Sequence, residues 1–180
     1  VLSSTKLKWF HSASAGVDKY LFPEFVNSET ILTSTSGIHR ISVSEMAIAH
    51  MLMFAKRLHK FMRFQLEKQW PPLMTAELAD KTVGIIGLGT IGMETAWKAK
   101  CFCKIVLALD YQWRAIKRPT YVDEILRPED LDYLLNESDY LVITVPLTRE
   151  THHMIGEREL KLMKPSAYII NMSRGAVIET

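Results

Sequence analysis

A glycine-rich turn between an apolar strand and a helix constrains the fold of this chain more than any other feature of its sequence. The turn has glycine at the three positions of a G-x-G-x-x-G motif and reads Gly87-Leu88-Gly89-Thr90-Ile91-Gly92. It follows the apolar run 82–86 and leads into a helical pattern over residues 91–101. A strand, a glycine turn of this spacing and a helix together predict a unit that binds a dinucleotide. A glycine turn that binds nothing is the alternative.

Each position of the turn has a physical task in this prediction. Gly87 permits the tight turn, Gly89 lets the backbone approach a pyrophosphate, and Gly92 allows the helix to pack closely. The amides of Thr90 and Ile91 lie in the first turn of the helix, where they have no helical partner and can face an anion. We therefore assign these five residues to cofactor binding.

An acidic residue follows the next predicted strand, which covers residues 104–109. Asp110 stands roughly 20 residues after the glycine turn, where a carboxylate accepts hydrogen bonds from the ribose hydroxyls of a dinucleotide. A carboxylate at this position repels a 2′-phosphate, so it favours NAD over NADP. Arg114, Lys117 and Arg118 follow closely, and a nearby cation is how such folds accept NADP. We prefer to interpret these cations as a solvated loop, which leaves NAD as the predicted cofactor and NADP as possible.

Further apolar strands alternate with helices after the turn. Strands are predicted over residues 104–109, 122–126, 140–145 and 167–171, and helices from residue 128 and over 157–163. Apolar strands that alternate with helices are typical of a parallel sheet covered on both faces. The predicted class is therefore α/β, with a Rossmann-type doubly wound parallel sheet.

The residues before the turn follow a different pattern. The first forty read as strand, turn, helix and strand. Ser42 and Glu45 have the spacing of a capping box, which predicts a long helix that begins at Ser42 and ends before the Trp-Pro-Pro sequence at residues 70–72. This helix is apolar nearly all round as far as Ala55, so we expect its first half to be buried between two bodies.

Composition narrows the possible functions. The 180 residues carry a net charge of only +2, which provides no basic surface for a nucleic acid. The longest apolar run is too short to span a bilayer, and no signal peptide opens the chain, so no membrane partner is expected. Cys101 and Cys103 offer no disulfide framework and favour a reducing compartment. We expect both cysteines to lie in the core and interpret Trp70 and Trp97 as packing residues and not as a platform for base stacking. No histidine pair has the spacing of a metal site.

Four sequence blocks resemble one known family, the D-isomer-specific 2-hydroxyacid dehydrogenases. The blocks are residues 14–18, the glycine turn with Asp110, residues 145–151 and residues 163–175. The resemblance implies a two-domain enzyme with its active site in the cleft between the domains. Residues 1–38 would be the C-terminal part of a flavodoxin-like substrate domain. Residues 39–180 would be an NAD-binding domain without its final strands and return helix.

The resemblance also implies the chemistry and most of the site. The reaction would be hydride transfer between nicotinamide and the C2 position of a small 2-hydroxy or 2-oxo acid. Arg174 matches the catalytic arginine, whose guanidinium can bind the substrate carboxylate and carbonyl together. Ala15 and Gly16 would offer backbone amides to the carboxylate, or they form only a tight turn. The remaining cofactor contacts would come from two loops and are Val145, Pro146, Thr151, Met172, Ser173 and Arg174.

Members of the family that this chain resembles complete the catalytic set with a Glu and a His downstream of the arginine. Only six residues follow Arg174, so we expect the chain to be part of a longer enzyme, cut at both ends and catalytically incomplete. In the family, the helix near Ser42 helps form a homodimer, and a cytoplasmic location is expected. The alternative function is an NAD(H)-sensing binding protein on the same scaffold, similar to transcriptional corepressors that resemble the family.

Overall fold

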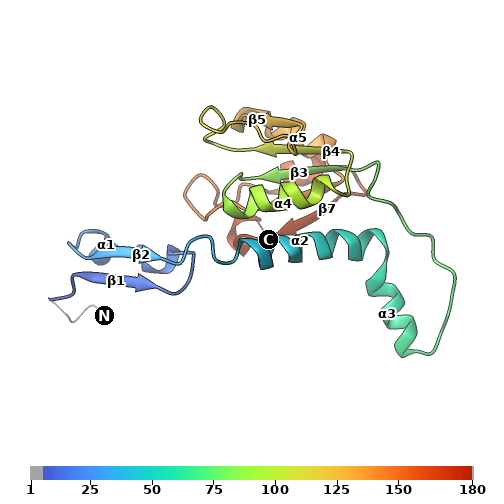
Figure 1. Cartoon of the computed structure of the whole chain (residues 1–180), viewed down its shortest axis with the longest axis horizontal. Coiled ribbons are helices and arrows are strands. Elements are labelled where there is room, and N and C mark those ends of the chain that lie inside the picture. Colours follow the sequence, from blue (N-terminus) through green and yellow to red (C-terminus); the bar gives the residue numbers. More distant parts are fainter. Residues whose placement is uncertain (1–5, 180) are drawn as a thin grey trace. The chain divides into compact units, whose positions relative to one another are not determined.

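The computed structural model describes residues 6–179, which fall into two compact units. The first unit contains the described residues up to Arg40, and the second contains those from Ile41 onward (Figure 1). Within the described residues, no helix is both long enough and apolar enough to cross a membrane.

The first unit is built on two parallel strands. β1 (Trp9–Ser12) pairs in register with β2 (Ile31–Ser34), and the connection contains the short helices η1 (Asp18–Tyr20) and α1 (Pro23–Val26). Phe10 makes edge contacts with the rings of Tyr20 and Phe25, and these contacts hold the connection against β1. The strand–turn–helix–strand order agrees with the prediction from the sequence.

The second unit is a five-stranded parallel sheet in the order β5-β4-β3-β6-β7. Its strands are β3 (Thr82–Ile86), β4 (Ile105–Leu109), β5 (Glu124–Leu126), β6 (Tyr140–Ile143) and β7 (Tyr168–Asn171). The chain builds outward from β3 to one edge and then crosses to β6 and β7 on the other side. This reversal of strand order is that of a Rossmann fold. The predicted class is therefore confirmed.

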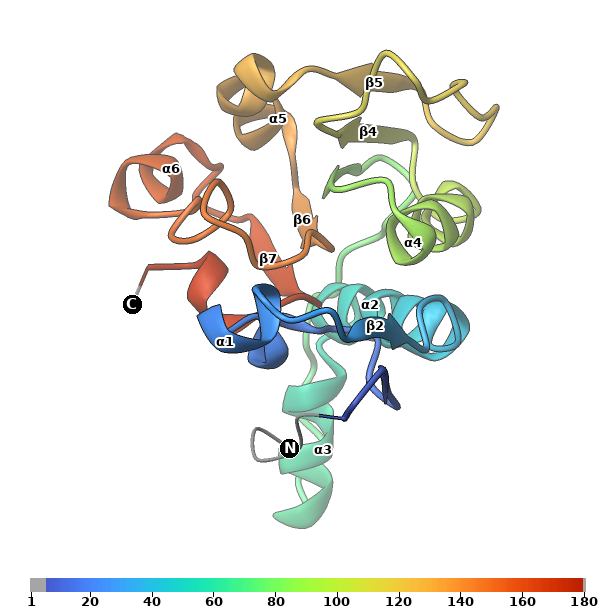
Figure 2. The same cartoon turned by 90° about the vertical axis from the view of Figure 1, so that its left-hand side faces the viewer.

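Helices cover both faces of this sheet (Figure 2). Apolar side chains of α2 (Arg40–Ala55) and α4 (Thr90–Lys100) pack on one face, with Met51, Ala96 and Ala99 fully buried. Leu134 and Leu135 of α5 (Leu131–Glu137) are buried on the other face, which Leu162 of α6 (Glu157–Leu162) also contacts. The short helices η2 (Pro128–Asp130) and η3 (Gly175–Val177) complete the described elements.

The predicted long helix is wrong, because the structure has two helices in its place. α2 begins at Arg40, so Ser42 lies inside the helix and is no cap. α2 ends at Ala55, and α3 (Leu58–Leu66) follows after Arg57, which adopts a left-handed conformation with φ 52°. The amide of Ala76 donates to the Ala55 carbonyl at 2.8 Å, and a continuing helix would need that acceptor for residue 59.

One of the two cysteines predicted to lie in the core is exposed, and so are the two tryptophans predicted to serve in packing. Cys103 is buried, but Cys101 lies on the surface, and Trp97 and Trp70 are 52% and 95% exposed. Trp97 and Cys101 are four residues apart and share the outer face of α4, because Ala96 and Ala99 take the face toward the sheet. An apolar stretch of sequence therefore did not indicate burial for this helix.

Candidate cofactor-binding site

A cavity of about 460 Å³ opens at the carboxyl ends of β3, β4 and β6. Its lining comes from the turns after these three strands and from one loop, and comprises Gly87, Leu88, Gly89, Asp110, Tyr111, Gln112, Ile116, Thr144, Val145, Pro146, Thr148, Glu150 and Thr151. β3 is the strand at which the strand order reverses, and open α/β sheets bind their ligands at this point. The volume lies within the range of small-molecule and cofactor sites.

The glycine turn has the geometry that a closely approaching ligand requires. Gly87 has φ +94°, a left-handed conformation that side chains other than glycine rarely adopt. A Cβ atom at Gly92 would lie 1.9 Å from the Gly87 carbonyl oxygen, so only glycine lets α4 pack against the turn. A Cβ atom at Gly89 would meet no protein atom within 4 Å. Gly89 lines the cavity, so the space beside it is available to a ligand and fits a pyrophosphate.

Thr90 and Ile91 form the first turn of α4 directly after Gly89, as predicted. Neither residue lines the cavity. Their amides belong to the group that an α-helix leaves without a helical acceptor, so they are suited to hydrogen bonding with an anion.

Asp110 connects the end of β4 to the glycine turn. Its Oδ2 atom accepts a hydrogen bond from the Leu88 amide at 2.7 Å, and its Oδ1 atom accepts one from the Gln112 amide, also at 2.7 Å. Each carboxylate oxygen keeps a second lone pair, which a ribose hydroxyl can use. The carboxylate is thus held in place by the backbone and lines the cavity, and its hydrogen bonding to a ribose stays a prediction.

The three cations after Asp110 do not line this cavity. The Arg114 guanidinium lies over the Trp113 ring, 4.9 Å from its centroid. Arg118 donates to the carbonyl oxygens of Val122 at 2.6 Å and Asp123 at 3.3 Å. These contacts hold the two arginines within their own loop, outside the cavity lining, so they do not contradict the interpretation of these cations as a solvated loop.

The loop after β6 forms the facing wall of the cavity. Thr151 is 3% exposed, and its Oγ1 atom donates to the Pro146 carbonyl oxygen at 2.6 Å and accepts from the Thr148 amide at 2.8 Å. Thr144 Oγ1 donates to the Gly87 carbonyl oxygen at 2.7 Å, which ties this wall to the glycine turn. Val145, Pro146 and Thr151 therefore line the cavity together with the turn and Asp110.

Met172, Ser173 and Arg174 follow β7 at the same edge of the sheet, but they do not line the cavity. Asn171 organises this segment. Its Oδ1 atom accepts from the amide and hydroxyl of Ser173 at 3.0 and 2.7 Å, and its Nδ2 atom donates to the Arg174 carbonyl oxygen at 2.8 Å. Met172 is held by its amide, which donates to the Ile143 carbonyl oxygen at 2.9 Å. The Arg174 residue is exposed.

Ala15 and Gly16 lie in the first unit, on the loop between β1 and η1. The Ser12 hydroxyl accepts from the Ser14 amide at 3.1 Å at the start of this loop. Binding of a substrate carboxylate by this loop stays a prediction.

Several lining residues were missed by reasoning from the sequence, namely Leu88, Tyr111, Gln112, Ile116, Thr144, Thr148 and Glu150. Most of them directly adjoin predicted residues, so extending each predicted contact along its strand end would have found them. Ile116 is different, because it enters the cavity from an irregular loop that carries no local signal.

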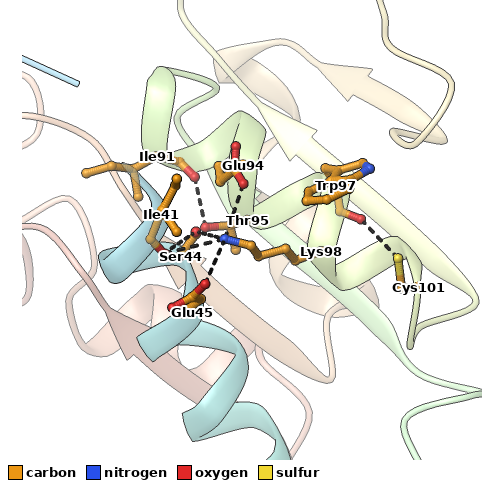
Figure 3. Close-up of polar contacts among 9 residues, drawn as sticks. All are labelled: Ile41, Ser44, Glu45, Ile91, Glu94, Thr95, Trp97, Lys98 and Cys101. Atoms are coloured by element: carbon orange, nitrogen blue, oxygen red, sulfur yellow. Dashed lines mark hydrogen bonds and ion pairs between the residues drawn. The ribbon is translucent and has the colours of Figure 1, made fainter. Parts of the chain in front are cut away.

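Lys98 of α4, the helix that follows the glycine turn, forms polar contacts with α2 (Figure 3). Its ammonium group donates to Ser44 Oγ at 2.7 Å and to the Ile41 carbonyl oxygen at 3.4 Å. It also lies 3.2 Å from Glu94 Oε1 and 3.9 Å from Glu45 Oε1. Glu45, predicted to cap its own helix, therefore faces a cation on the neighbouring helix. Since the Lys98 side chain is only 17% exposed, we expect these contacts to fix α4, the helix that begins directly after the cavity-lining Gly89.

Comparison with known proteins identifies the family. Residues 48–180 match the family model described as "D-isomer specific 2-hydroxyacid dehydrogenase, NAD binding domain". The chain belongs to this family. The resemblance inferred from the four sequence blocks is therefore confirmed.

Relatives and solved structures agree with this assignment. A glyoxylate reductase of Thermococcus litoralis is 38% identical over 99% of this chain and 56% of its own length. A D-lactate dehydrogenase from Aquifex aeolicus, in complex with NAD and lactic acid, is 31% identical with a TM-score of 0.83, covering 97% of this chain and 52% of that one. An NADPH-dependent glyoxylate/hydroxypyruvate reductase from Sinorhizobium meliloti is 25% identical with a TM-score of 0.82, covering 96% and 55%. The chain thus spans just over half the length of these proteins.

Proposed function

We propose that the protein carrying this chain binds NAD at the 460 Å³ cavity and transfers hydride between the nicotinamide and C2 of a small 2-oxo or 2-hydroxy acid. One observation carries the proposal: the glycine turn, the Asp110 carboxylate and the loop after β6 line one cavity at the switch point of the sheet. The names of the relatives, which act on glyoxylate and lactate, support the substrate class. They favour an enzyme over an NAD(H)-sensing corepressor.

Some of the predicted site residues would bind the cofactor and others the substrate. Gly89 and the first turn of α4 would hold the pyrophosphate, and Asp110 would accept from the ribose hydroxyls. The bound nicotinamide supplies or receives the hydride. Arg174 would bind the substrate carboxylate and stabilise negative charge on the C2 oxygen. The amides of the loop at Ala15 and Gly16 would complete the carboxylate site.

Cofactor preference tests the role of Asp110. We expect tighter binding of NADH than of NADPH, because the carboxylate would repel a 2′-phosphate and no cation of the loop lines the cavity. The Asp110→Ala variant should bind NADH more weakly and lose most of this preference, measured by fluorescence titration with each cofactor. Tighter binding of NADPH by the unmodified protein would contradict the proposal.

Turnover tests the role of Arg174. Oxidation of NADH would be followed at 340 nm with glyoxylate, hydroxypyruvate and pyruvate, and oxidation of phosphoglycerate would be followed with NAD. In the full-length protein, Arg174→Ala should lower kcat/KM by at least 100-fold while the Kd of NADH changes little. Arg158→Ala is the matched control, because that arginine is exposed on α6 and pairs with Asp132. Failure of the full-length protein to turn over any of the four substrates would favour the sensor.

Assembly and location are also part of the proposal. We propose a homodimer formed through α2, because Ile41 and Met46 of this apolar helix are 50% and 51% exposed. Met46→Glu should then shift the protein from dimer to monomer in light scattering, and a monomeric unmodified protein would refute the dimer. We also propose a cytoplasmic location, because a sequence with only two cysteines, two residues apart, offers no disulfide framework of the kind that secreted proteins use, and cell fractionation would test it.

A further inference from the structure

A second cavity, of about 190 Å³, lies at the amino ends of the strands, at the opposite end of the same sheet from the first cavity. Its lining comes from the end of α2, from the segment before β3 and from the amino ends of β6 and β7, and comprises Phe54, Ala55, Arg57, Ala76, Lys81, Asp139, Tyr140, Ser166 and Tyr168. All these residues belong to the second unit, and none of them lines the cavity at the glycine turn. The second cavity is therefore separate from the proposed cofactor site.

Three aromatic rings form one wall of this cavity. Tyr168 stacks on Phe54 with a centroid distance of 4.5 Å and an interplanar angle of 11°, and on Tyr140 at 5.5 Å and 17°. The stack joins α2 to β6 and β7, so the wall is held by the core of the unit. An apolar cavity of roughly 150 Å³ can hold benzene. A cavity of 190 Å³ therefore has room for one ring with a small polar group.

Positive charge is in excess around the cavity. Asp139 is its one acidic lining residue, and it lies 3.7 Å from the Lys81 ammonium and 3.3 Å from that of Lys164. The Thr82 amide also donates to this carboxylate, at 3.0 Å. Arg57 adds another cation, and within the described part of the chain its guanidinium has no partner. An anion entering the cavity would thus meet an arginine whose donors are available.

Tyr140 supplies a second available donor. It is only 3% exposed, and its hydroxyl makes no hydrogen bond to any residue that the structure describes. Burial raises the pKa of Tyr140 to about 12, so the hydroxyl stays protonated at neutral pH and can donate. Among the described residues, the hydroxyl is not one of the buried polar atoms that lack a partner, so it is accessible, and Tyr140 lines the cavity, where a ligand could accept a hydrogen bond from it.

We propose that this cavity binds a small organic carboxylate with a ring-sized apolar body. The carboxylate accepts hydrogen bonds from Arg57 and Tyr140, and the apolar body packs on the aromatic wall of Phe54 and Tyr168. An inorganic anion satisfies the donors but leaves the wall uncovered, whereas a neutral ring covers the wall but leaves the donors unpaired. The inference does not depend on the proposed dehydrogenase activity, because the two cavities share no residue.

Benzoate is the probe, and calorimetry on the purified full-length protein is the measurement. Arg57→Asn removes the charge while keeping a residue that tolerates the left-handed backbone at φ 52°. Tyr140→Phe removes the hydroxyl and keeps the ring stack, so it still tests the site if the first variant is unstable. Each substitution should weaken benzoate binding by about tenfold or more. Arg63→Gln is the charge control, because Arg63 is exposed on α3 and lies outside the cavity lining.

Each outcome of the benzoate titration either supports or refutes the proposed carboxylate site. Benzoate binding that both variants weaken, that Arg63→Gln leaves unchanged and that saturating NADH does not displace supports the proposal. Absence of benzoate binding at 10 mM, a concentration on the order of the weakest ligand affinities, overturns it. Displacement by NADH assigns benzoate to the cofactor cavity and also overturns it. Inorganic phosphate or benzyl alcohol binding as tightly as benzoate refutes the assigned ligand class. Because turnover is not measured here, failure of this test leaves the proposed dehydrogenase activity unaffected.

Discussion

Alanine at Gly89 should affect stability and cofactor binding in opposite directions. The residue has φ −67° and ψ −170°, which alanine adopts without strain, and a Cβ atom there meets no protein atom within 4 Å. Replacing such a glycine stabilises a protein by about 0.4–1 kcal/mol, because the unfolded chain loses conformational freedom. For a chain of 180 residues, this corresponds to a rise in Tm of roughly 1–4 °C.

The same methyl group would occupy the space assigned to the pyrophosphate. The Kd of NADH should therefore rise at least tenfold in Gly89→Ala, a cost of about 1.4 kcal/mol or more. Calorimetric unfolding and fluorescence titration on the same preparation measure the two effects. A lower Tm would show that the Gly89 site does not accommodate a methyl group, and an unchanged Kd for NADH would show that the pyrophosphate does not lie beside Gly89.

Gly92→Ala provides the contrast within the same motif. Its Cβ atom would lie 1.9 Å from the Gly87 carbonyl oxygen, and backbone cannot yield as a flexible side chain can. We expect destabilisation of at least about 1–3 kcal/mol, with weaker cofactor binding as a consequence. The pair separates a glycine required by the ligand from one required by the fold. Equal loss of stability in both variants would show that this distinction is wrong.

Three further predictions concern other parts of the structure. Lys98→Met should cost about 1–3 kcal/mol in urea unfolding, because it leaves the hydrogen-bond acceptors of α2 and α4 without their shared donor. Burial acts to raise the pKa of Asp123, but the hydrogen bond from Lys100 at 2.6 Å and other contacts lower it overall. Its contribution to stability is therefore present above the ordinary carboxyl pKa and lost as the pH falls through the lowered value, so Asp123→Asn should be less stable at pH 7 and approach the unmodified protein below about pH 4. A thiol reagent at pH 8 should label Cys101 quickly and Cys103 only on unfolding, because burial raises the pKa of the Cys103 thiol to about 11; mass spectrometry identifies the labelled residue.

The parts of the fold that could be predicted are those set by local sequence. β3 covers residues 82–86 as expected, because its apolar residues are all buried between two layers of helices. The glycine turn and Asp110 could be predicted as well, because each directly follows the end of a predicted strand. Such signals depend on neighbours within a few residues, which a single sequence displays directly.

The failures arise where distant segments compete with local preference. Ser42 and Glu45 have capping-box spacing, but Glu45 faces Lys98 on another helix and Ser42 lies inside its own. The helix predicted to continue past Ala55 ends where the Ala55 carbonyl accepts from the distant Ala76 amide and Arg57 adopts a left-handed conformation. Local capping contributes only about 1 kcal/mol, so a few tertiary contacts are enough to override it.

The second cavity shows why a site that has no sequence motif cannot be predicted from the sequence. Arg57, Lys81 and Tyr140 are separated by 24 and 59 positions and share no pattern. Lys81 and Tyr140 come together because β3 and β6 are parallel neighbours whose amino ends lie at the same end of the sheet, and Arg57 reaches the same cavity from the end of α2. In a parallel sheet, the carboxyl ends of the strands form a ligand site that can be predicted. The amino ends also bring together side chains from distant positions in the sequence. A site at the amino ends can be recognised only in the structure, since its chemistry depends on which residues precede each strand.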